Sequence, residues 1–144
     1  MNIIKDELLV PLDDYRVLDS KNPIGYTRDI HSCIVALVHK TKCSVLLHIE
    51  ADDRNINIDY FLEALKREEG NKIKSVDLFI GDDTNIGNLS IVQFILHRFN
   101  IPYNEYKVFR NNSNETSVGF NYITKEYYMA TMDKGMPILT KKMI

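Results

Sequence analysis

Two apolar runs separated by a polar turn form the clearest pattern in the sequence, and they predict a β-hairpin. The runs are Ile34–Val38 and Val45–Ile49, and the basic segment His39–Cys43 joins them. Successive residues of a strand point to opposite faces of its sheet, and in both runs both faces are largely apolar. This pattern is typical of strands that are covered on both sides.

After residue 50 the apolar positions switch between helical and strand periods. Helical spacing appears in Ile56–Glu69 and in Ile86–Phe99, the second with Thr84 or Asn85 as a candidate N-cap. Strand character appears in Ser75–Ile80, Tyr103–Phe109, Thr116–Tyr122 and Tyr127–Met132, with a further strand near Ile138.

The segment before the hairpin is less regular. Leu8–Val10 and Tyr15–Leu18 are short apolar runs that predict one or two short strands, and Ser20–Gly25 has the Pro and Gly residues of a turn. The whole order of elements predicts an α+β (mixed α/β) fold with mostly antiparallel strands and two helices that cover one face. A chain of 144 residues without a linker or repeat predicts one domain over residues 1–144.

The charge, the apolar stretches and the cysteine count of the sequence argue against several classes of protein. The formal net charge of −2 gives no basic surface for nucleic acid. No stretch has the length of a membrane span, and the early charge of Lys5 argues against a signal peptide. Two cysteines make no disulfide framework and no zinc-type cluster is present, so we expect a cytoplasmic protein in a reducing compartment without a cofactor.

Cys33 and His48 are the main candidates for chemistry, because an imidazole beside a thiol can generate a nucleophilic thiolate. The turn length decides whether they meet. A two-residue loop at Lys40–Thr41 would place Cys33 opposite His48, and a four-residue loop at Lys40–Cys43 would place it diagonally, with Cβ atoms about 4.5–8 Å apart in these two cases. A three-residue loop would put them on opposite faces. The turn lacks the glycine of a primed two-residue turn, which favours the four-residue loop.

A third group would orient the imidazole, and Thr27, Asp29 and Glu50 are near enough in sequence. Glu50, Asp52 and Asp53 form an acidic group just after His48, which is either a solvated turn or a site for a cationic substrate group such as an α-amino group. A metal site on Asp52, Asp53 and His48 matches no established spacing, so we expect no metal.

The competing interpretation is that Cys33 is only a buried cysteine and His48 only a hydrogen-bonded histidine. The sequence suggests no catalytic partner for Cys43 at a matching strand position, and we expect it to be structural. His97 should face solvent from its helix, and His31 is expected to be an exposed loop residue. We assign no role to His39.

The segment Thr27–Cys33, TRDIHSC, resembles the start of the CheD-type chemoreceptor glutamine deamidases. That resemblance implies a layered α/β/β sandwich and a Cys-His-Thr triad, which falls here on Cys33, His48 and Thr27. The Cys–His spacing is slightly shorter than in that family, and Asp29 and His31 stand where its glycines usually precede the cysteine.

The chain is also similar to the protein N-terminal asparagine amidohydrolases. The similarity lies in the DxxSC pattern of Asp29–Cys33, the LxHxE stretch of Leu46–Glu50, DLFIGDD at Asp77–Asp83 and FNYITKEY at Phe120–Tyr127. The deamidase toxins of the cytotoxic necrotizing factor type use a similar Cys–His site, which would imply an effector delivered into a host cytosol.

These observations lead us to expect a cysteine-dependent amidohydrolase that deamidates a glutamine or asparagine side chain of a protein or peptide through a thioester. A regulatory protein partner is compatible with that activity. One alternative is a transglutaminase or protease with the same kind of acyl-enzyme, and another is a non-catalytic binding module. The sequence does not distinguish glutamine from asparagine or an internal site from an N-terminal one.

Overall fold

The structure is a computed structural model, and it describes residues 9–11, 14–27, 30, 32–51, 56–66, 72–108, 116–133 and 136–142. The elements in chain order are β1 (Asp14–Leu18), β2 (Ile24–Thr27), β3 (Ile34–Lys40), β4 (Ser44–Ile49), α1 (Asp59–Lys66), β5 (Ile73–Gly81), α2 (Ile86–Arg98), β6 (Tyr103–Val108), β7 (Thr116–Asn121), β8 (Glu126–Asp133) and β9 (Met136–Lys142).

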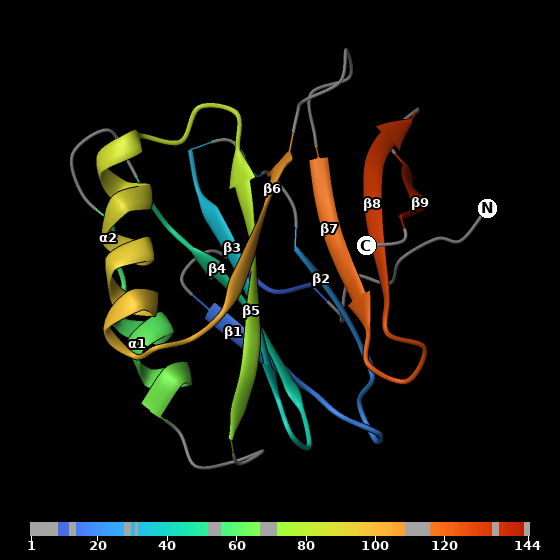
Figure 1. Cartoon of the computed structure of the whole chain (residues 1–144). Helices are drawn as coiled ribbons and strands as arrows, with labels where there is room; N and C mark the ends of the chain where they lie inside the picture. Colours follow the sequence, from blue (N-terminus) through green and yellow to red (C-terminus); the bar gives the residue numbers. More distant parts are fainter. Residues whose placement is uncertain are drawn as a thin grey trace.

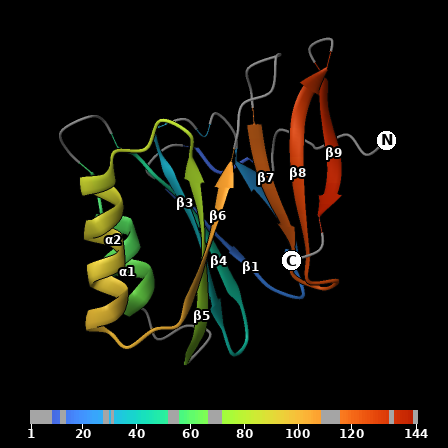
Figure 2. The same cartoon turned by 45° about the horizontal axis from the view of Figure 1, so that its top comes forward.

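These elements form three layers: a helix layer, a five-stranded sheet and a four-stranded sheet (Figure 1). The five-stranded sheet has the order β1-β4-β3-β5-β6, and the four-stranded sheet has the order β2-β7-β8-β9. The turned view in Figure 2 shows α1 and α2 together on one side of the five-stranded sheet and the other sheet on the opposite side. The predicted α+β class, with two helices on one face and mostly antiparallel strands, is confirmed.

The hairpin of β3 and β4 has the register of the four-residue loop. Val35 lies opposite His48, and His39 lies opposite Ser44 at the last pair before the turn. A further backbone hydrogen bond of 2.8 Å, from Lys40 N to Cys43 O, tightens the turn beyond that pair. Residues 33 and 48 are therefore related diagonally rather than directly across the pair of strands.

One neighbouring pair of strands is parallel. β5 and β6 run in the same direction, with Asp77 opposite Asn104, and α2 connects them. A parallel connection needs a long crossover, and α2 provides it. Asn85 caps this helix, because its side-chain oxygen accepts hydrogen bonds from the amides of Gly87 and Asn88.

The hydrophobic core has two parts, one on each face of the five-stranded sheet. The residues between this sheet and the helices include Ala36, Leu47, Phe61 and Leu96, all almost completely buried. The residues between the two sheets include Leu37, Leu46, Phe79 and Phe120. The central strands β3 and β4 are thus buried on both faces, as their continuous apolar runs predict.

β1 and β2 are consecutive in sequence but lie in different sheets. β1 pairs with β4, and β2 pairs with β7. Between them, the Asp19 side chain accepts hydrogen bonds from the amides of Lys21 and Asn22, at 2.9 and 2.8 Å, and holds a tight turn. Because the chain passes from one sheet to the other at this turn, Thr27, at the end of β2, faces His48 of β4 across the space between the sheets.

The expectation that Ser20–Gly25 is a turn was wrong at its C-terminal end, because β2 begins at Ile24. Gly25 lies within a strand at a close approach of the two sheets, where an added Cβ would lie 3.0 Å from Leu18 Cδ2. The glycine thus serves close packing rather than a turn. No helix among the described ranges is long and apolar enough to cross a membrane.

The intersheet core can be tested with Leu46, which is fully buried between the sheets. Leu46→Ala removes buried methyl groups and leaves a cavity, so we expect a loss of about 2–5 kcal/mol in the free energy of unfolding. The matched control is Ile123→Ala, at a side chain that is 62% exposed. This variant should change the free energy of unfolding by less than about 0.5 kcal/mol. Urea denaturation followed by circular dichroism measures both, and an equal effect of the two variants would contradict the assignment.

Candidate active site at the end of the central hairpin

His48 lies near the end of β4 and points into the space between the two sheets. Its partner in β3 is Val35 and its partner in β1 is Asp14, and only 2% of His48 is exposed. Leu37 and Leu46, the next residues on the same face, belong to the intersheet core. An imidazole in such apolar surroundings needs hydrogen bonds from neighbouring polar groups.

Thr27 provides one of these hydrogen bonds from the opposite sheet. Its Oγ1 lies 2.6 Å from His48 Nδ1 and donates to the carbonyl oxygen of Val10 at 2.7 Å. A hydroxyl has a single hydrogen, and a carbonyl can only accept, so the Thr27 oxygen is the acceptor toward His48. The hydrogen bond therefore places a hydrogen on Nδ1.

This assignment has a chemical consequence for the ring. When Nδ1 carries the hydrogen, Nε2 holds the lone pair of the neutral imidazole. Nε2 is out of contact with solvent. A nucleophile–base pair would use the ring in this state, with the base oriented through its second nitrogen.

Cys33 lies one residue before β3 and is 7% exposed. The hydrogen bonding between β3 and β5 extends to Cys33. Beyond the last pair, Ile34 and Ile80, the amide of Gly81 donates to the Cys33 carbonyl oxygen at 3.2 Å. The Thr84 hydroxyl donates to the same carbonyl at 3.2 Å. Strand alternation then puts Cys33 on the face of Val35 and His48, diagonal to His48, where side chains of such pairs are about 7–8 Å apart.

The other predicted site residues are placed less fully. Glu50 is exposed and directly follows β4. Asp29, His31, Asp52 and Asp53 lie outside the described residues. Among the three candidate orienting groups, Thr27 is the one whose contact with the imidazole the structure gives. Cys43 packs in the core on the helix side, and neither it nor Cys33 is in a disulfide.

A second polar cluster, which was not expected from the sequence, also crosses between the sheets. His39 Nε2 lies 2.9 Å from Asp77 Oδ2 and 2.5 Å from the Tyr127 hydroxyl, and His39 Nδ1 lies 2.9 Å from Ser44 Oγ. The Tyr127 hydroxyl also donates to Asp77, and Asn104 Nδ2 donates to Asp77 Oδ1 at 3.2 Å. Asp77 is a single carboxylate inside the apolar strand SVDLFI, and that signal could have indicated a buried partner.

The charges in this cluster favour an ionised Asp77. Burial raises the pKa of the Asp77 carboxyl, but the hydrogen bonds from His39, Tyr127 and Asn104 and the electrostatic attraction of His39 outweigh burial and lower it. Burial is the largest cause that raises the pKa of Tyr127 far above its ordinary value, and the hydrogen bond to Asp77 and the negative charge of Asp77 raise it further. Tyr127 therefore remains a hydrogen-bond donor, and the cluster is fully connected.

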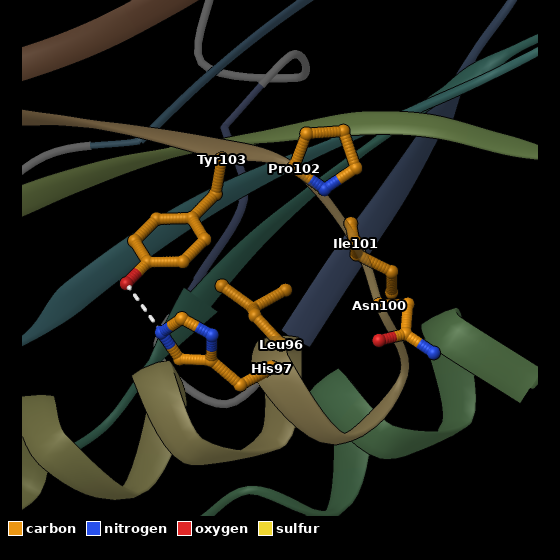
Figure 3. Close-up of a pocket in the computed structure, with 6 residues that line it drawn as sticks. All are labelled: Leu96, His97, Asn100, Ile101, Pro102 and Tyr103. Carbon is orange, nitrogen blue, oxygen red and sulfur yellow. Dashed lines mark hydrogen bonds between the residues drawn. The ribbon is translucent and has the colours of Figure 1, made fainter.

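The structure also has an open hollow of about 460 Å³ beside the C-terminal end of α2, away from His48. Its lining is drawn in Figure 3 and consists of Leu96, His97, Asn100, Ile101, Pro102 and Tyr103. His97 is exposed, as predicted, and its Nε2 lies 3.5 Å from the Tyr103 hydroxyl. The described residues that line the hollow include no thiol or carboxylate, so they offer no groups for the proposed chemistry.

No protein-family model matches the sequence, and no curated protein is significantly similar to it. Within the described ranges, no group of three or more His, Cys, Asp or Glu side chains is arranged to hold a metal ion.

Thr27→Val tests the hydrogen bond between the sheets. The variant keeps the shape of the side chain but deprives both His48 Nδ1 and Val10 O of a buried partner, so we expect a loss of about 1–3 kcal/mol in the free energy of unfolding. Thr27→Ser keeps the hydroxyl, so its free energy of unfolding should fall less than that of Thr27→Val. Chemical denaturation of the two variants decides the point, and equal stability of Thr27→Val and the wild type would refute it.

Asp77 predicts a pH dependence of stability. Its pKa is lowered in the folded state from 3.8, so as the pH falls the unfolded chain takes up the proton first. The stability that Asp77 provides is complete above about pH 4 and is lost as the pH falls through the lower folded pKa. We therefore expect the difference in unfolding free energy between wild type and Asp77→Asn to be large at neutral pH and to shrink below about pH 4.

Urea denaturation across that range measures this difference. Tyr127→Phe keeps the ring and removes one donor to Asp77, so it should reduce the pH dependence without abolishing it. A difference between wild type and Asp77→Asn that stays constant with pH would show that the carboxylate charge is irrelevant.

Proposed function

We propose that this protein is a cysteine-dependent amidohydrolase that deamidates a glutamine or asparagine side chain of a protein or peptide. The observation that supports this most is the hydrogen bond from His48 Nδ1 to Thr27, which leaves the basic nitrogen of the imidazole as Nε2. Strand alternation from Ile34 puts Cys33 on the same face as His48, and Cys33 is the nucleophile in this proposal. Both cysteines are outside disulfides, which fits a reducing cytoplasm.

In the proposed reaction His48 Nε2 takes the proton of the Cys33 thiol, and the thiolate sulfur attacks the carboxamide carbon of the substrate. The C–N bond of the tetrahedral intermediate then breaks, and the imidazolium gives its proton to the departing ammonia. A water molecule, deprotonated by His48, attacks the thioester carbon. The carboxylate product leaves, and Cys33 regains its proton.

Thr27 acts in this scheme as a positioning residue. Its hydroxyl is fixed by Val10 O and accepts from Nδ1, so the imidazolium formed during catalysis keeps its orientation and one strong hydrogen bond. Asp29 and Glu50 are the alternative groups for this role. The backbone amides around Ser32 and Cys33 are the proposed donors to the tetrahedral oxyanion. The hydrogen bonds from Gly81 and Thr84 to the Cys33 carbonyl hold the backbone at this point.

The resemblance to CheD-type deamidases, to N-terminal asparagine amidohydrolases and to deamidase toxins suggests the substrate class. For an N-terminal asparagine or glutamine, Glu50, Asp52 and Asp53 would bind the α-ammonium group. A transglutaminase or protease would use the same acyl-enzyme and differ only in the group that leaves or attacks. The other alternative is a binding module without catalysis, in which the buried Cys33 and His48 would only be packed in the core.

The decisive experiment uses Cys33→Ala and Cys43→Ala as a matched pair, since both remove a buried thiol. We expect Cys33→Ala to abolish ammonia release from glutamine and asparagine peptides and Cys43→Ala to retain it. His48→Asn should reduce the rate by about 10²–10⁴-fold, as expected for the loss of a general base. Thr27→Val should reduce it less.

The mass of the product separates the alternatives. Deamidation replaces NH2 by OH and leaves the peptide whole, transfer joins two molecules, and proteolysis divides the peptide. Full activity of Cys33→Ala would refute the proposal. Alkylation of Cys33 by iodoacetamide at the slow rate of an ordinary thiol, without pH dependence near neutrality, would favour the binding module.

A further inference from the structure

The outward side of α2 is unusually apolar. The helix contains no charged residue before its last turn. Three of its large apolar side chains are nevertheless exposed: Ile86 at 81%, Phe94 at 68% and Ile91 at 42%. A surface helix normally has charged or polar residues on the side away from the core, and a helix that is apolar all round is usually covered all round.

Ile91 and Phe94 share one stripe along the helix, and Ile86 lies at the edge of that stripe. Val92, Ile95 and Leu96 face the sheet and are buried. Gly87, Ile91, Phe94 and Arg98 follow one another at spacings of four, three and four residues, which align on one side of an α-helix, and all four are exposed. We call these four residues, with Ser90 between them, the α2 outer face. In Figure 1 α2 lies at the edge of the molecule, and no other labelled element lies on its outer side.

We propose that the α2 outer face binds a second copy of this chain, with the two α2 helices antiparallel across a two-fold axis near Ser90 and Ile91. Such an axis brings each residue of one helix against the residue equally far on the other side of the axis. Phe94 of one copy then meets Gly87 of the other, so that the largest side chain of the face lies over the position without one. Ser90 meets Ile91 in the same way.

The charges at the ends of the helix are complementary in this arrangement. The same axis brings Arg98, in the last turn, toward Asp83 of the second copy, which lies in the loop just before the helix. Both residues are exposed, and the two-fold axis repeats the pair. A parallel arrangement would instead place like charges together, so the charge pattern selects the antiparallel dimer.

The small size of the face limits the affinity. A helix of 13 residues is about 20 Å long, and one such helix covers less than the roughly 800 Å² per partner of a typical stable interface. We therefore expect a dimer with a micromolar dissociation constant rather than an obligate one. Gly87 also has a local role, because a Cβ there would lie 2.9 Å from the capping oxygen of Asn85, so Gly87 is not a suitable position for a test.

Sedimentation equilibrium of the full chain over micromolar to millimolar concentrations tests the proposal. The wild type should move from 16.7 kDa toward twice that mass as the concentration rises. Phe94→Glu should keep it monomeric. The control Ile123→Glu places the same charge at another exposed apolar residue, 62% exposed in the turn between β7 and β8, and should dimerise like the wild type.

A charge exchange gives a second, independent test that leaves the apolar residues intact. Arg98→Glu should weaken dimerisation at least tenfold, because a carboxylate of one copy then opposes the Asp83 carboxylate of the other. Adding Asp83→Arg to Arg98→Glu should restore it. Circular dichroism and the urea midpoint verify that each variant is folded.

Three results would overturn the proposal. The first is a wild type that remains monomeric at millimolar concentration, and the second is a dimer that Phe94→Glu leaves intact. The third is a double variant that dimerises no better than Arg98→Glu alone. A monomer that binds phosphatidylcholine vesicles through Phe94 would assign the face to a lipid surface instead.

Discussion

The hydrogen bond from His48 to Thr27 is the contact on which the candidate site depends. It crosses from the five-stranded sheet to the four-stranded one, next to the apolar side chains of the intersheet core. A buried imidazole is costly without such partners, and Thr27 supplies one while giving its own hydrogen to Val10. One hydroxyl thus joins the N-terminal segment, β2 and β4, and fixes both the orientation and the protonated nitrogen of the ring.

A second polar crossing lies nearer the other end of the hairpin. Asp77, His39 and Tyr127 form a connected set of hydrogen bonds between the same two sheets. Satisfied polar networks in a core restrict how two layers can pack, because any shift of register leaves a buried group unpaired. The two crossings together therefore define how the four-stranded sheet lies on the five-stranded one. His39 and Asp77 are accordingly structural, and the proposed chemistry belongs to the end with Cys33.

The loop from Gly81 to Asn85 links the features proposed here. Gly81 and Thr84 hold the carbonyl of Cys33, and Asn85 caps α2. Asp83, in the same loop, is the proposed contact of Arg98 from a second copy. A dimer formed through α2 would thus rest against the loop that supports the proposed nucleophile. The reaction and the association nevertheless use different side chains, so each can fail without the other.

The sequence alone determined the local features, because local rules encode them. The continuous apolar runs identified β3 and β4 as strands buried on both faces, and the absence of a glycine in their turn indicated the four-residue register that the structure has. Thr84 and Asn85 similarly marked the start of α2 as candidate caps, and Asn85 is the residue that caps it. Tertiary structure decided what lies between the sheets. Gly25 suggested a turn, but it lies in a strand, where a Cβ would lie 3.0 Å from Leu18 Cδ2 of the other sheet. The partners Thr27–His48 and His39–Tyr127 are separated by 21 and 88 residues, and no local periodicity specifies which strands of two sheets face each other. That choice is made only when the apolar faces pack and every buried polar group finds a partner.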